Sequence, residues 1–153
     1  MSLSKTSSEI GVLFHVCDAA AANEAVASLR NIQVPVRIYL SVDNEVEQIA
    51  VTSVIHAHGL EDRTVVRIVP KIARETGPFV FGFREEVFKH EICLRIHTDR
   101  SKHANSELAA LWQHHLFDEL VGGSQRIDYV LEQFATHETL GVLRATPWLC
   151  PHR

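Results

Sequence analysis

Five consecutive polar residues follow directly on an apolar stretch of the chain, and their side chains could bind and react with a phosphate ligand. They are His97, Thr98, Asp99, Arg100 and Ser101. An arginine could hold phosphate oxygens through charge-assisted hydrogen bonds, and a carboxylate could ligate a divalent cation shared with a diphosphate. A histidine could donate to a phosphate or act as a base. The alternative is a solvated loop whose polar residues cap the next helix.

From these chemistries we predict a role for each residue of the segment. His97 and Asp99 are predicted to be catalytic, and Asp99 is also predicted to hold Mg²⁺ or Mn²⁺. Thr98, Arg100 and Ser101 are predicted to contact the substrate.

Four further charged residues follow predicted strands and could line the same site. Arg74 and Glu75 come after the third predicted strand, where the alternative is a surface ion pair before a helix that begins at Pro78. Asp18 and Asp43 follow the first two strands and could contact a nucleotide base or ribose. As simple N-caps they would need no ligand to explain them.

Alternating strands and helices are expected to position these side chains. The apolar runs 10–17, 36–42, 64–69 and 91–96 predict strands, and 140–143 could add a fifth. Helices are predicted over 19–30, from Asp43 or Asn44 to Gly59, within 78–90, over 106–120 and over 125–136. This order predicts an α/β fold with a mainly parallel sheet and helices on both faces, in which ligands bind beyond the carboxyl ends of the strands.

The apolar positions of these helices predict which faces pack inward. On the second helix they are Val46, Ile49 and Val54; on the helix over 106–120 they are Leu108, Leu111, Trp112, Leu116 and Leu120. The fourth strand is apolar enough to be expected near the centre of the sheet.

Composition favours a single globular domain over 10–153, preceded by a disordered or tag-derived segment, 1–9. Hydrophobic residues make up 46% and charged residues 22% of the chain, as in ordinary globular proteins. A net charge of −4 without a basic run disfavours nucleic acid as a partner. No signal peptide or membrane-length apolar run is seen, so we expect a cytoplasmic protein. The last residues, 143–153, resemble a strand and loop cut short, which favours a truncated domain.

Cysteine and histidine patterns indicate neither a disulfide framework nor a zinc site. Cys17, Cys93 and Cys150 are far apart, and the first two lie in apolar runs typical of buried cysteines. The ten histidines lack recognisable zinc-ligand spacing. Walker, dinucleotide-binding, serine-hydrolase and zinc-protease motifs are missing as well.

Several segments, taken in order, resemble the rhamnan synthesis protein F family of bacterial cell-surface polysaccharide synthesis. The first strand carries His15, residues 29–41 resemble a family stretch rich in apolar residues, and residues 74–79 and 94–101 resemble its Arg-Asp-x-x-Pro-Phe and Lys-Ile-His-Thr motifs. Trp112 then follows on a helix. The chain departs from the family at Ala73, Glu75, Arg95 and Asp99, where the family has Gly, Asp, Lys and Lys.

The resemblance implies a glycosyltransferase-like domain with a Rossmann-like fold that binds a nucleotide-sugar donor, such as a dTDP-rhamnose type, and a glycan acceptor. By position, Asp99 could restore the metal-binding carboxylate that sugar transferases commonly place after the fourth strand. One alternative is a non-catalytic α/β module that binds within a polysaccharide synthase complex. A flavodoxin-like signalling domain is less favoured, because only Asp18 follows the first strand where that site needs paired acidic residues.

Overall fold

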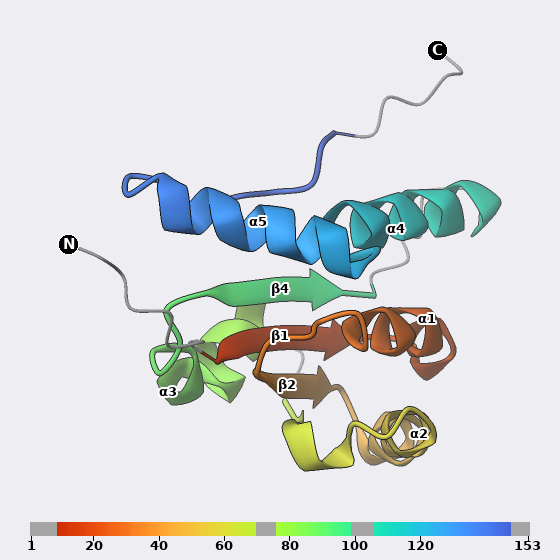
Figure 1. Cartoon of the computed structure of the whole chain (residues 1–153). Helices are drawn as coiled ribbons and strands as arrows, with labels where there is room; N and C mark the ends of the chain where they lie inside the picture. Colours follow the sequence, from red (N-terminus) through yellow and green to blue (C-terminus); the bar gives the residue numbers. More distant parts are fainter. Residues whose placement is uncertain (1–8, 70–75, 99–105, 148–153) are drawn as a thin grey trace.

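The computed structural model describes residues 9–69, 76–98 and 106–147, and they form an α/β fold around one parallel sheet (Figure 1). Its strands are β1 (Ile10–Val16), β2 (Val36–Val42), β3 (Thr64–Ile68) and β4 (Cys93–His97). They lie in the order β3-β2-β1-β4, and every neighbouring pair is parallel. The predicted fold class is confirmed. The predicted disordered segment lies almost wholly outside the described residues.

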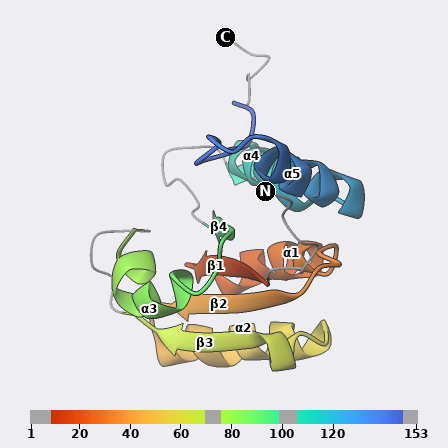
Figure 2. The same ribbon diagram turned by 60° about the vertical axis from the view of Figure 1, so that its left-hand side comes forward.

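Helices lie on both faces of the sheet, as predicted, because the chain reverses its direction across the sheet after β3. Helices α1 (Ala19–Leu29) and α2 (Glu45–Ala57), followed by the short helix η1 (Glu61–Arg63), connect β1, β2 and β3 in turn. From β3 the chain returns past β2 and β1 to reach β4, and this connection carries the π-helical turn η2 (Pro78–Gly82) and α3 (Arg84–Val87). Figure 2 shows α3 on the side of the sheet away from α2. The strand order therefore switches between β1 and β4.

The core is divided by the sheet into two clusters. Every residue of β1 is buried, as expected for a strand covered on both faces. The larger cluster joins one face of the sheet to α1, α2, α4 and α5 and includes Phe14, Leu29 and Val51. The smaller one joins Leu13 and Tyr39 on the other face to Phe83 beside α3.

Helices α4 (Ser106–Val121) and α5 (Ser124–Thr136) pack against each other beside β4, and α4 buries only part of the face predicted for it. Leu116 and Leu120 are half-buried, and Leu120 packs against the larger core cluster. Leu108, Leu111 and Trp112 are exposed, whereas Phe117 and Val121 are buried. Apolar residues occur on more than one side of α4. The sequence pattern alone therefore does not determine which side of α4 is buried, and packing against α1 and α5 selects it.

The inward face predicted for α2 also needs correction. Val46 and Ile49 are 76% and 71% exposed, whereas Val54 is partly buried against the larger core cluster as predicted, and the fully buried residues are Val51 and Ile55. The buried pair has i, i+4 spacing, so it forms a stripe facing the sheet on its own.

Two strand predictions are wrong. β4 lies at the edge of the sheet rather than near its centre, since among the described strands it pairs only with β1. Residues 140–143 form no strand. The segment is fixed to the helices instead, because the Thr146 hydroxyl donates to Glu119 of α4 and His115 bonds to the Thr146 carbonyl. Cys93, predicted to be buried, is exposed on this edge strand.

His114 links α4 to α1 and makes the stability of this contact depend on pH. Its Nδ1 contacts Glu24 of α1, and its Nε2 lies 3.1 Å from Asp118. The hydrogen bond to Glu24 and the charge of Asp118 raise the pKa of His114. The raised pKa means that the charged pairs stabilise the fold below the unfolded-state pKa, and that this stabilisation is lost as the pH rises through the folded-state pKa.

We expect the His114 pairs to add ~0.3–1 kcal/mol more to the free energy of unfolding at about pH 6 than at about pH 9. The contribution is small because the side chains are exposed. Urea denaturation of the wild type and of His114→Gln at both values measures the difference. His56→Gln removes another exposed histidine–glutamate pair, within α2 and η1, and serves as the control. A His114→Gln protein with the full pH dependence of the wild type would contradict the assignment.

Candidate functional site at the carboxyl edge of the sheet

Each described residue that the sequence predicts for the site lies at the carboxyl edge of the sheet. Asp18 follows β1, Asp43 follows β2, and His97 and Thr98 end and follow β4. Carboxyl ends of parallel strands meet at one edge, so the shared edge follows from the topology. Arg74, Glu75, Asp99, Arg100 and Ser101 lie outside the described residues.

His15 forms a buried hydrogen bond with Ser41 and lies next to Asp43. In the sheet register His15 of β1 is paired with Ser41 of β2 on one side and with His97 of β4 on the other. His15 Nδ1 lies 3.0 Å from the Ser41 hydroxyl, and both residues are buried. Its Nε2 lies 3.8 Å from Asp43 Oδ1. That distance is too long for a hydrogen bond, and the two groups attract as an ion pair only when His15 is protonated.

Asp43 is the member of this cluster that reaches the surface. Its side chain is 20% exposed, against 8% for His15. A carboxylate accepts hydrogen bonds only, so Asp43 can bind ligand hydroxyl or amino groups. The sequence left open whether Asp43 or Asn44 caps α2. Asn44 is the cap, accepting from the Glu47 amide at 3.0 Å.

The importance of His15 was missed by reasoning from residue types. It appeared there only as part of the family resemblance. Its signal was available, since a histidine within an otherwise apolar buried strand must find a polar partner. The partner could not be identified without the register, because Ser41 lies 26 residues away.

Thr98 has a structural contact rather than an open position at the edge. It is fully buried, and its hydroxyl accepts a hydrogen bond of 3.1 Å from the Cys17 amide. Its own amide donates to the His15 carbonyl at 3.1 Å. These bonds continue the β1–β4 pairing by one residue. These contacts give Thr98 a structural role, and its contact with substrate stays a prediction.

Carboxylates of the protein occupy the amino end of α1. Asp18 caps the helix by accepting from the Ala20 amide, and Glu47 of α2 accepts from the Ala19 amide, both at 2.9 Å. Helix amino ends attract anions, and here the protein supplies the negative charge itself. This part of the edge therefore suits ligand hydroxyl groups better than a phosphate.

Arg67 extends the row of paired residues onto β3, where it is paired with Ser41 in the register. Its guanidinium donates to the Gly82 carbonyl at 2.7 Å, bonds to Glu86 of α3 and lies over the Phe83 ring. Burial alone would raise the pKa of Glu86, but the hydrogen bond from Arg67 makes the overall shift a lowering. Arg67 thus holds α3 against the sheet.

The described residues provide no metal centre by themselves. Among residues 9–69, 76–98 and 106–147, no three His, Cys, Asp or Glu side chains are grouped so that they could hold a metal ion. Within the same ranges no helix is long and apolar enough to cross a membrane.

A doubly wound parallel sheet with polar side chains beyond β1, β2 and β4 places the protein in the class of open α/β folds, whose ligands generally bind at the carboxyl edge of the sheet. The comparison with family models is more specific. The chain belongs to the rhamnan synthesis protein F family, whose model matches residues 2–148. Membership places it in rhamnan polysaccharide synthesis. No curated protein and no solved structure matches the chain.

Proposed function

We propose that this protein binds a nucleotide-activated sugar at the carboxyl edge of the sheet and takes part in its transfer to a growing glycan. The observation that carries the proposal is the partly exposed Asp43 carboxylate. It lies next to His15, which is buried and hydrogen-bonded to Ser41. Family membership supports a sugar ligand, and the strand order supports the location, because ligands of open α/β sheets bind where that order switches.

The roles of the edge residues follow from their chemistry. Asp43 binds hydroxyl groups of the ribose or sugar, and Asp18, which follows the neighbouring strand β1, is a second proposed contact. His97, paired with His15 in the sheet register, is the proposed base. The amino end of α1 is already occupied by carboxylates, so the diphosphate is assigned to Arg74, Arg100 and Ser101, and Glu75 to another part of the substrate; all four lie outside the described residues. The proposal includes Mg²⁺ or Mn²⁺ held by Asp99.

Replacing Asp43 by asparagine is expected to weaken nucleotide-sugar binding about 10- to 100-fold. A hydrogen bond to a charged group contributes roughly 1.5–3 kcal/mol, and asparagine keeps the size of the side chain while removing its charge. Titration calorimetry with dTDP-rhamnose and other nucleotide sugars, with and without Mg²⁺ or Mn²⁺, measures the change. Asp128→Asn alters an exposed aspartate on α5 and is the matched control.

The outcomes distinguish the proposal from its alternative. Binding that Asp43→Asn weakens and Asp128→Asn leaves unchanged supports the site. Binding without transfer of the sugar to a glycan acceptor identifies the protein as a non-catalytic module of the synthesis machinery. A folded wild type that binds no nucleotide sugar at any metal concentration rules the proposed site out.

A further inference from the structure

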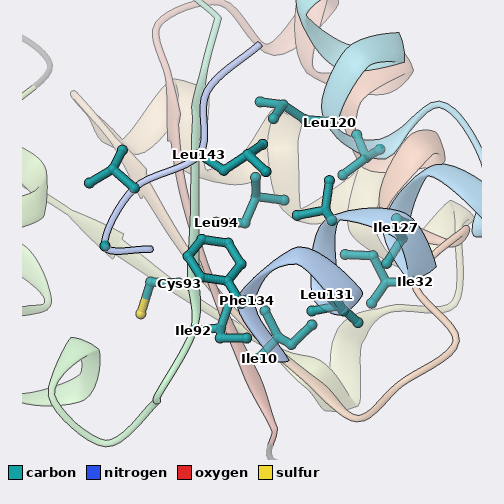
Figure 3. A pocket seen from close by; sticks show the side chains of 14 residues that line it. Ile10, Ile32, Ile92, Cys93, Leu94, Leu120, Ile127, Leu131, Phe134 and Leu143 are labelled. Atoms are coloured by element: carbon teal, nitrogen blue, oxygen red, sulfur yellow. The ribbon is translucent and has the colours of Figure 1, made fainter. Parts of the chain in front are cut away.

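A hollow lies away from the polar edge, between β4 and the helix pair α4–α5 (Figure 3). Its volume is about 170 Å³. Ile10 at the start of β1 and Ile92 and Leu94 of the β4 region form one wall, and Leu131 and Phe134 of α5 face them. Because Ile10 begins β1 whereas Asp18 follows its end, the hollow and the polar edge lie toward opposite ends of that strand.

The side chains that line this hollow are apolar, and the polar atoms that reach it belong to the backbone. Its residues are isoleucine, leucine, valine, phenylalanine and glycine, apart from Cys93, whose thiol contacts the Val87 carbonyl. Water in a protein cavity needs two to four polar partners, and apolar cavities of comparable size stay dry and accept hydrocarbons. The lining therefore favours an apolar occupant over water.

A short strap, residues 141–145, covers one side of the hollow. It is fixed at both ends, by the Leu140 amide bonded to the His137 carbonyl and by Thr146 bonded to Glu119. Between these points its backbone makes no hydrogen bond to the backbone of another described residue. Val142 and Leu143 both line the hollow, and Val142 is mostly exposed to solvent. A strap held only at its ends can move without breaking backbone hydrogen bonds, which gives a hydrocarbon chain a way in.

We propose that this pocket binds the alkyl chain of an amphiphile, with the polar end of the molecule left at the strap. A cavity of about 150 Å³ holds benzene, so the pocket has room for a hydrocarbon portion of about six carbons. The hollow is partly open to solvent, so filling it with hydrocarbon removes apolar surface from water and adds contacts. This inference does not depend on the proposed nucleotide-sugar site.

Titration calorimetry with a series of linear alkanols, from butanol to decanol, tests the pocket. We expect saturable binding with one site per chain, and affinity that rises about fourfold with each added methylene, since each contributes about 0.8 kcal/mol. The rise should stop once the chain is longer than the pocket. Affinity that increases without saturation, as in partitioning to a surface, would overturn the proposal.

Substitutions that fill the pocket separate it from other apolar surface. Val130→Phe places a ring in the pocket and is expected to weaken alkanol binding at least tenfold, whereas Val46→Phe on the exposed side of α2 should leave it unchanged. Leu143→Phe fills the pocket from the strap without altering either helix, so it provides the same test if Val130→Phe does not fold. Wild-type affinity in a folded pocket-filling variant would show that the alkanol binds elsewhere.

Discussion

Replacing Phe14 by alanine is expected to lower the free energy of unfolding by about 3–5 kcal/mol. Phe14 lies on β1, which has strand neighbours on both sides, and its side chain is 1% exposed within the larger core cluster. Truncation removes the favourable transfer of the ring from water and leaves a cavity that the rigid sheet cannot close. Domains of this size have total stabilities of about 5–15 kcal/mol, so the loss is a large part of the whole.

Urea denaturation of purified Phe14→Ala followed by circular dichroism measures this change. Phe88→Ala is the matched control, since Phe88 is 81% exposed and its truncation should change stability by less than about 0.5 kcal/mol. Equal effects of the two substitutions would show that β1 is not at the centre of the core.

Adding a single methyl group at Gly11 is expected to cost about 2–3 kcal/mol, because it displaces a buried histidine. A Cβ at Gly11 would lie 2.7 Å from the His90 ring, closer than such contacts are found. His90 Nδ1 donates to the Glu9 carbonyl at 2.8 Å, because a carbonyl can only accept. In the neutral ring Nε2 then accepts from the Tyr39 hydroxyl, also at 2.8 Å.

Moving the His90 ring would break both bonds and leave a buried phenol without its acceptor. Burial raises the pKa of Tyr39, so its hydroxyl keeps the proton that it donates to His90. Thermal and urea denaturation of Gly11→Ala measure the loss, and Gly141→Ala is the control because its added Cβ would meet no atom within 4 Å. A Gly11→Ala protein as stable as the wild type would mean that His90 moves without cost.

The two proposed binding sites, the polar edge and the apolar pocket, lie toward opposite ends of β1 and differ in chemistry. Asp43 and His15 lie at the carboxyl edge, where a sugar ligand is proposed, and Ile10 lines the pocket proposed for an alkyl chain. The substitutions Asp43→Asn and Val130→Phe therefore should act independently, since they change groups that do not share a contact. Each variant serves as a folding control for the test of the other site.

The fold class and the site edge were predictable from the sequence because both depend on local patterns. The run 10–17 contains too many apolar residues for a strand with a solvated face, and its alternation with helices implies parallel pairing. Once pairing is parallel, Asp18, Asp43 and His97 must share one edge. The cap at Asp18 and the helix end at Gly59, which has a positive φ of 64°, follow from the same local chemistry.

Other features were decided only by tertiary structure, because they depend on which segments meet. The edge position of β4 follows from the return of the chain after β3, which local patterns do not encode. The inward stripes of α2 and α4 were chosen by their neighbours from several apolar faces. The His15–Ser41 bond and the burial of Thr98 require strand register, which pairs residues 26 and 81 positions apart. The amino-acid pattern thus determined the elements and the shared edge, while long-range packing decided which polar groups were used inside the protein and which remained open to a ligand.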